Sequence, residues 1–200
     1  MALRELRAEI PRTILHVGGG ALLAILGYGL PVPSNRVVLG IIFLAAVAVE
    51  AGRKTSPVVD GLTATWLGVF MRPSERFRVT GALPFTGGIF LTFLLFQKEV
   101  ALLAVIPLVV GDRAAILVGK WIGRVRFGKK SLEGSLACFI VSFLTIFCVA
   151  GFAPGAFPYP AWILLGASVV GTVAEALPSP FDDNLTIPLA VAVFIYWVGA

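Results

Sequence analysis

The sequence predicts an all-α, multi-pass integral membrane protein that forms a single domain over residues 1–200. Of its 200 residues, 58% are hydrophobic and only 14% are charged, and the mean hydropathy is +0.95. Soluble domains are about half apolar and a quarter charged, so this composition is typical of a chain that lies largely in a bilayer. A membrane-spanning helix needs roughly 20 apolar residues, so the length leaves no room for a separate soluble domain.

The apolar runs predict about six transmembrane helices and one shorter interfacial or re-entrant segment. Arginines among the first 12 residues predict a short interfacial helix, and residues 57–71 could lie in the interface or dip into the membrane. Pro84, Gly87 and Gly88 interrupt the third apolar run, and Pro107 lies inside the fourth. We expect the spans at about 13–30, 37–52, 80–96, 100–118, 136–152 and 161–177, with a last helix at 185–198.

The basic residues predict how the chain is oriented. If the N-terminus lies inside and residues 57–71 stay on the inner face, nearly all Lys and Arg clusters fall on that side. Cytoplasmic loops carry such an excess, so we expect a multi-pass protein of the cell membrane whose polar site faces the cytoplasm. The net charge of +5 then reflects contact with anionic lipid head groups, and we expect no nucleic-acid partner.

A carboxylate near the end of an apolar run, Asp112, precedes a basic loop rich in glycine. An ionisable group within a span is costly, so Asp112 is either paired with a cation such as Arg113 or functional. Glycines allow backbone N–H groups to approach phosphate oxygens, and basic side chains add charge-assisted hydrogen bonds. We also expect Ser131 to cap the next helix and direct its free N–H groups at an anion. The candidate phosphate ligands are Lys120, Arg124, Lys129, Lys130 and Ser131.

A second polar cluster precedes the last helix and consists of Glu175, Asp182, Asp183 and Asn184. Carboxylate and amide oxygens are ligands for Mg²⁺ or Ca²⁺, although a solvated turn uses the same residue types. The predicted topology places Asp112 on the same side, and together these residues predict a divalent metal that bridges a polyphosphate. Three further residues fall on this side, where each could contact the site or simply join two helices: Arg12, His16 and Glu50.

With these residues identified, the sequence resembles the CTP-dependent lipid-alcohol kinases. This family includes dolichol kinase, phytol kinase and the CTP-using diacylglycerol kinase of fungi. The resemblance covers most of the chain, and its specific part begins at Gly111-Asp112 and continues through Gly119 and Gly123-Arg124. The remaining matches are Lys130-Ser131-Leu-Glu133-Gly134-Ser135, Glu175 with Asp183-Asn184 and Pro188, and the pair Arg12 and His16.

The resemblance implies that the γ-phosphate of CTP is transferred to the hydroxyl of a membrane lipid alcohol. On this interpretation Asp112, Asp183 and Glu175 hold the metal, because phosphoryl transfer depends on positioning and charge. Either Asp112 or Glu175 would orient or deprotonate the alcohol. The lipid remains open between polyprenol, dolichol, diacylglycerol and related isoprenoid alcohols, and the oligomeric state is equally open. The resemblance also places these residues at the nucleotide: Gly111, Glu133, Gly134, Ser135 and Asn184.

Two alternatives predict different chemistry. The phosphatidate cytidylyltransferases share the Gly-Asp and Lys-Lys-Ser-x-Glu-Gly block, but they also carry a His-Gly-Gly-x-x-Asp-Arg signature near the C-terminus. This chain has no such segment, which favours a kinase. A small ion-coupled transporter would also place acids inside the membrane, but it would require no nucleotide.

Overall fold

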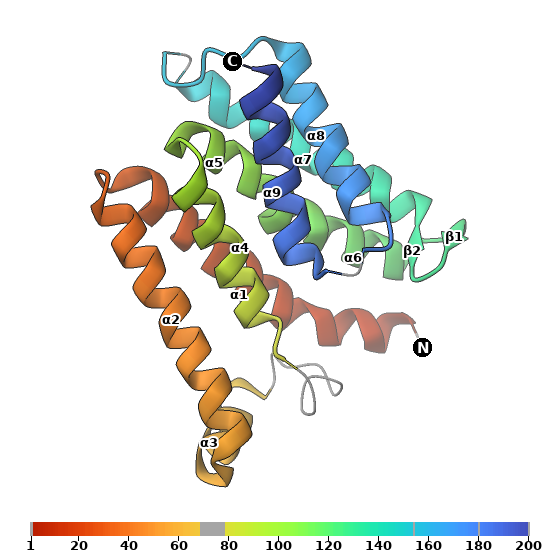
Figure 1. Cartoon of the computed structure of the whole chain (residues 1–200). Coiled ribbons are helices and arrows are strands. Elements are labelled where there is room, and N and C mark those ends of the chain that lie inside the picture. Colours follow the sequence, from red (N-terminus) through yellow and green to blue (C-terminus); the bar gives the residue numbers. More distant parts are fainter. Residues whose placement is uncertain (1, 69–78, 154, 180, 200) are drawn as a thin grey trace.

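The computed structural model describes residues 2–68, 79–153, 155–179 and 181–199, which form a helical bundle (Figure 1). The expected all-α architecture is confirmed except for one small antiparallel hairpin, in which β1 (Arg126–Phe127) pairs with β2 (Lys130–Ser131). The helical elements are α1 (Ala2–Gly29), α2 (Ser34–Thr55), α3 (Pro57–Leu67), α4 (Ala82–Leu95), α5 (Lys98–Ile106), the π-helical turn η2 (Pro107–Gly111), α6 (Asp112–Trp121), α7 (Leu132–Phe152), α8 (Ala161–Ala176) and α9 (Asp183–Val198).

Four helical segments of the described chain are long and apolar enough to cross a membrane. They cover residues 9–29, 34–55, 98–121 and 132–152. The helices α4, α8 and α9 are apolar but have only 14, 16 and 16 residues, fewer than the roughly 20 that span a bilayer without thinning it. The structure therefore supports a multi-pass membrane protein with four candidate spans, and the count of six stays a prediction.

Two prolines lie within helices without ending them, Pro11 in α1 and Pro84 in α4. The helix α1 continues through Pro11, so the expected interfacial helix at residues 1–12 is not separate from the first span. A proline costs a helix one hydrogen bond and bends it without having to end it. Pro84 lies in the first turn of α4, where its missing N–H would have no acceptor within the helix.

The segment 57–71 was expected to lie in the interface or to re-enter the membrane. Most of it forms α3, which exposes Val58, Leu62 and Trp66 at helical spacing. Residues 69–71 lie outside the described residues. Whether this apolar face contacts the interface or enters the bilayer stays a prediction.

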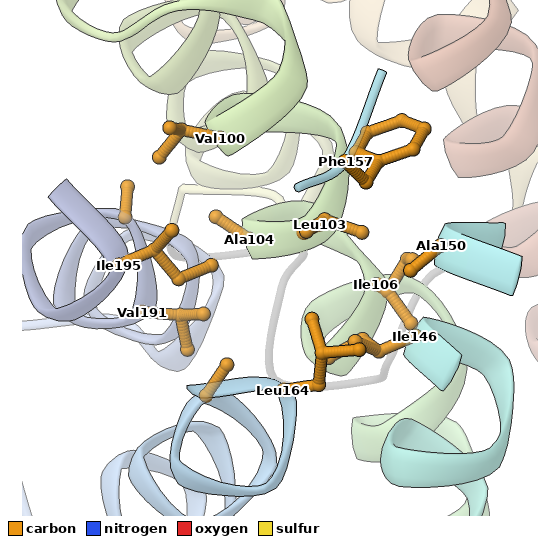
Figure 2. Packing of buried hydrophobic residues seen from close by; sticks show 12 residues of the cluster. Val100, Leu103, Ala104, Ile106, Ile146, Ala150, Phe157, Leu164, Val191 and Ile195 are labelled. Atoms are coloured by element: carbon orange, nitrogen blue, oxygen red, sulfur yellow. The ribbon is translucent and has the colours of Figure 1, made fainter. Parts of the chain in front are cut away.

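The segment Lys98–Trp121 forms the centre of the bundle. Two thirds of its apolar window (67%) is buried, compared with 28% or less in the other three candidate spans. Figure 2 shows one of its two apolar clusters, in which Leu103 and Ile106 pack with Ile146 of α7, Leu164 of α8 and Ile195 of α9. The π-helical turn η2 accommodates Pro107 without ending the helix, and α6 then begins at Asp112.

Candidate functional site

The centre of the candidate site is the ammonium group of Lys130, which joins three elements. Lys130 lies in β2, and its Nζ donates hydrogen bonds to Glu175 Oε1 at 2.7 Å and to Asp183 Oδ2 at 2.8 Å. Glu175 is near the end of α8 and is only 1% exposed, whereas Asp183 begins α9. Ser135, in the first turn of α7, donates to Glu175 Oε2 at 3.3 Å. The basic loop and the acidic cluster therefore meet at one end of the bundle.

The two carboxylates keep Lys130 positively charged. Burial of the ammonium would by itself lower its pKa, but the hydrogen bonds to Asp183 and Glu175 and the attraction of their charges outweigh this effect. The pKa of Lys130 is therefore raised above its ordinary value of 10.5. A permanent cation at this position suits the binding of an anionic ligand.

A cavity of about 360 Å³ opens beside Lys130. Small-molecule sites usually measure about 300–1,000 Å³, so this volume is in the range of a ligand site. Its wall combines four basic side chains with two hydroxyl groups and one carboxylate, a lining that favours a phosphate-bearing ligand over an apolar one. The lining residues are Ala115, Ile116, Gly119, Lys120, Arg126, Lys129, Lys130, Ser131, Gly134, Ser135 and Glu175.

The loop between α6 and α7 is ordered by local hydrogen bonds. Gly128 adopts a φ of 64° at the first position of the two-residue turn between β1 and β2, where a side chain would be strained. Ser131 caps α7 as expected, because its Oγ accepts from the backbone N–H of Gly134 at 3.1 Å. Glu133 Oε1 accepts from the backbone N–H groups of Arg124 and Val125. These contacts hold the basic side chains along one edge of the cavity.

The glycines of this region have a packing role that the phosphate interpretation did not include. A Cβ on Gly134 would lie 2.7 Å from the carbonyl oxygen of Ala115, and a Cβ on Gly119 would lie 2.9 Å from Ser131 Oγ. Such contacts are too close for a side chain, so the glycines let α6 approach β2 and the start of α7. Both glycines also line the cavity, so the same close approach shapes its wall.

Comparison with known proteins identifies relatives over nearly the whole chain. The chain is 29% identical to CTP-dependent diacylglycerol kinase 1 of Schizosaccharomyces pombe over 204 residues, which cover 95% of this chain and 93% of that protein. It is 28% identical to the protein of the same name from Saccharomyces cerevisiae, covering 94% of this chain and 72% of that protein. This chain is similar to the fungal CTP-dependent diacylglycerol kinases over nearly its whole length. The resemblance inferred from the motifs is thereby confirmed.

A bacterial relative matches over a shorter range. The uncharacterized protein RP860 of Rickettsia prowazekii is 34% identical over 106 residues, which cover 52% of this chain and 50% of that protein. No family model matches the chain. No solved structure matches it either.

Six of the residues that carry the resemblance line the cavity, namely Gly119, Lys130, Ser131, Gly134, Ser135 and Glu175, but Asp112 does not. Asp112 is 5% exposed, and Arg113 donates to its Oδ2 from Nε at 3.0 Å and from a terminal nitrogen at 2.6 Å. This is the structural pairing that the sequence left open. Asp112 nevertheless lies one turn before Ala115, which lines the cavity.

The predicted metal ligands Asp112, Asp183 and Glu175 do not form one three-ligand cluster. In the part of the chain that the structure describes, no group of three such side chains is arranged to hold a metal ion. Glu175 and Asp183 instead share the Lys130 ammonium. Two carboxylates that converge on one positive charge are a partial ligand set for a divalent cation.

Several other predicted nucleotide ligands have structural partners outside the cavity wall. Gly111 allows η2 to approach Ser142 and Cys138 of α7, and Arg124 contributes its backbone N–H to Glu133. Asp182 Oδ1 caps α9 by accepting from the backbone and side chain of Asn184. These residues therefore shape the surroundings of the site.

Of the residues considered near the site, two join helices elsewhere. The Nε2 atom of His16 lies 3.1 Å from the carbonyl oxygen of Leu108, and its ring packs on Phe85. Glu50 forms an ion pair with Arg53 at 2.8 Å and accepts from the Thr80 hydroxyl at 2.9 Å. His16 joins α1 to η2, and Glu50 joins α2 to the residues just before α4. Both agree with the helix-joining alternative.

Sequence reasoning missed Glu9, and it did not assign Arg126 to the site. Arg126 lines the cavity, and a terminal nitrogen of its guanidinium lies 3.4 Å from the Gly119 carbonyl oxygen. Glu9, only 3% exposed, binds the cavity residue Lys120 and also Arg12. The basic loop itself was the signal for Arg126. Glu9 and Lys120 are 111 positions apart, so no local pattern links them.

Proposed function

We propose that this protein is a CTP-dependent lipid kinase. It transfers the γ-phosphate of CTP to the hydroxyl of a membrane lipid alcohol, with diacylglycerol as the first candidate because three relatives carry that name. The observation that carries the proposal is the cavity in which four basic side chains face the buried carboxylate of Glu175. Residues 1–200 act as one kinase domain, and the site faces the cytoplasm, as the basic loops favour.

The basic side chains of the cavity bind the triphosphate. Lys120, Arg126, Lys129 and Lys130 supply charge-assisted hydrogen bonds, and Ser131 and Ser135 line the same wall. Phosphoryl transfer requires positioning and positive charge more than covalent chemistry, which matches a wall of this composition. Of the loop residues expected to bind phosphate, Arg124 acts indirectly, through its hydrogen bond to Glu133.

Glu175 and Asp183 are the residues that fit a divalent metal, either Mg²⁺ or Ca²⁺. Mg²⁺ is usually held by only one or two carboxylates together with the phosphates of the substrate, so a three-carboxylate cluster is not required. Both carboxylates already approach one cation, the Lys130 ammonium. The metal would neutralise charge on the phosphates, and Asp112 remains the third candidate ligand.

One carboxylate must also orient or deprotonate the acceptor hydroxyl. Glu175 is better placed than Asp112, because its side chain lines the cavity while Arg113 holds the carboxylate of Asp112. Ser135 and Lys130 fix the two oxygens of Glu175, so the carboxylate is held ready for the hydroxyl.

The proposal is tested with purified protein in vesicles that contain diacylglycerol, with CTP labelled at either the α or the γ phosphate. We expect the γ label to enter the lipid and the α label to remain in solution. Entry of the α label would indicate a cytidylyltransferase. If neither label enters the lipid, whether the vesicles contain diacylglycerol, dolichol or polyprenol, the result would contradict a lipid kinase and favour transport. Replacing CTP by ATP tests the choice of nucleotide.

A further inference from the structure

A buried carboxylate outside the cavity holds one of the cavity's basic residues. Glu9 lies in α1, its side chain is 4% exposed, and its Oε1 accepts from Lys120 Nζ at 2.7 Å. Lys120 lies in the last turn of α6, and its side chain is 36% exposed and lines the cavity. The helices α1 and α6 pack against each other. The buried end of this ion pair is therefore Glu9, and the end that reaches the ligand space is Lys120.

Glu9 also brings a second cation to the same place. Arg12, one turn later in α1, lies 3.2 Å from the same oxygen of Glu9. The Lys120 and Arg12 nitrogens share an acceptor at 2.7 and 3.2 Å, so they are at most about 6 Å apart, a separation at which like charges repel. The carboxylate between them offsets this repulsion and allows both to remain.

We infer that Glu9 is a positioning residue for the triphosphate of CTP, an inference that rests on the proposed function. Glu9 holds Lys120 at the edge of the cavity, where its ammonium binds phosphate oxygens. Lysine has a flexible four-carbon stem, so an ammonium that is fixed before the ligand arrives loses less entropy on binding. Arg12 takes part indirectly, because it holds the carboxylate of Glu9 from the other side.

Two effects of losing the Glu9 charge oppose each other. Without the carboxylate the cavity becomes more positive, which favours an anion. Lys120, however, is then repelled by Arg12 and can extend into solvent, since its side chain is already partly exposed. A cation that leaves the cavity no longer contributes to binding, so we expect the loss of position to dominate.

The test measures the Kd of CTP by titration calorimetry with wild-type protein and with Glu9→Gln, Lys120→Met and the double variant. Glu9→Gln should raise the Kd about tenfold, the factor that corresponds to one lost charge-assisted contact. The double variant should bind no more weakly than Lys120→Met alone, because Glu9 acts through Lys120. In kinetic assays the KM for CTP should rise while the KM for diacylglycerol stays unchanged.

The matched control is Glu99→Gln, at the start of α5; it should leave the Kd unchanged. If Glu9→Gln does not fold, Glu9→Asp keeps the charge but shortens its reach, and it should raise the Kd about threefold. An unchanged or lower Kd in the folded Glu9 variants would overturn the inference, as would a further loss in the double variant. Wild-type protein that binds no CTP would instead contradict the proposed function.

Discussion

Lys130 is the residue on which the acidic and basic halves of the site depend. Its ammonium is bound by Glu175, which is almost fully buried, and by Asp183, whose side chain is 33% exposed. A buried carboxylate is stable only when it is paired, so Lys130 also compensates the charge of Glu175 before any ligand arrives. The same contacts fix its ammonium beside the cavity, where a phosphate would bind.

Replacing Lys130 by methionine should therefore reduce both stability and activity. Lys130→Met leaves Glu175 without its cation, and we expect a loss of about 3 kcal/mol in the free energy of unfolding. Adding Glu175→Gln should restore most of that stability, because the buried charge is gone, but not the kinase activity. Thermal unfolding and CTP-dependent lipid phosphorylation measure the two effects.

Lys129→Met is the matched control, because Lys129 is an exposed residue of the same loop. Its stability should change by no more than about 0.5 kcal/mol, as for most surface positions. A double Lys130/Glu175 variant that is no more stable than Lys130→Met would show that the pair does not stabilise the fold in this way.

The pKa of Lys130 predicts how stability depends on pH. The pKa is raised in the folded protein above its ordinary value of 10.5. The ion pairs therefore contribute fully below that value, and their contribution is lost as the pH rises through the folded pKa. Arginine remains protonated at these pH values, so Lys130→Arg should lose less stability than wild type as the pH rises above 10.5. Thermal unfolding at each pH measures this, and equal alkaline losses would contradict it.

At the scale of elements, the site depends on how closely α6 approaches the start of α7. A side chain at Gly119 would collide with Ser131, and a side chain at Gly134 would collide with the backbone of Ala115. The hairpin formed by β1 and β2 connects the two helices (Figure 1). From this hairpin, Lys130 donates to Glu175 of α8 and to Asp183 of α9. The cavity is therefore a product of helix packing as much as of loop sequence.

Gly134→Ala should disturb both this packing and the cavity. The added Cβ would meet the Ala115 carbonyl oxygen at 2.7 Å, and backbone atoms cannot move aside as a flexible side chain can. We expect a loss of about 1–3 kcal/mol in stability, as for other overpacked positions, together with weaker CTP binding.

Gly151→Ala, in the same helix, provides the control because nothing lies within 4 Å of the added Cβ. Alanine favours a helix over glycine, so this variant should be neutral or slightly more stable. If both alanine variants behave alike in thermal unfolding and CTP titration, the close approach at Gly134 is not what shapes the site.

For the whole molecule, the open question is how many helices cross the membrane. We predict that α4 and α8 cross although they are short, because the basic clusters then stay on one side. In a chain without Cys138 and Cys148, an impermeant thiol reagent should label Thr55→Cys and Ser179→Cys only from the cytoplasmic side. The same reagent should label Gln97→Cys and Gly155→Cys only from the opposite side.

Each pair in this experiment tests a different helix. Labelling of Gln97→Cys from the side of Thr55→Cys would show that α4 does not cross. Labelling of Gly155→Cys from the side of Ser179→Cys would show the same for α8. Purified protein treated with the reagent in detergent, where all four positions are accessible, is the control for reactivity.

Composition and periodicity by themselves determined the helical membrane fold, the approximate positions of its helices, and the two polar clusters that form the site. These properties depend on nearby residues and can be read along the chain. Only the tertiary structure decided which side chains meet: Lys130 with Glu175 and Asp183, and Lys120 with Glu9. These partners are 45, 53 and 111 positions apart. It also showed Asp112 paired with its neighbour Arg113. Contacts over such distances depend on how helices pack and turn their faces, which no local pattern specifies.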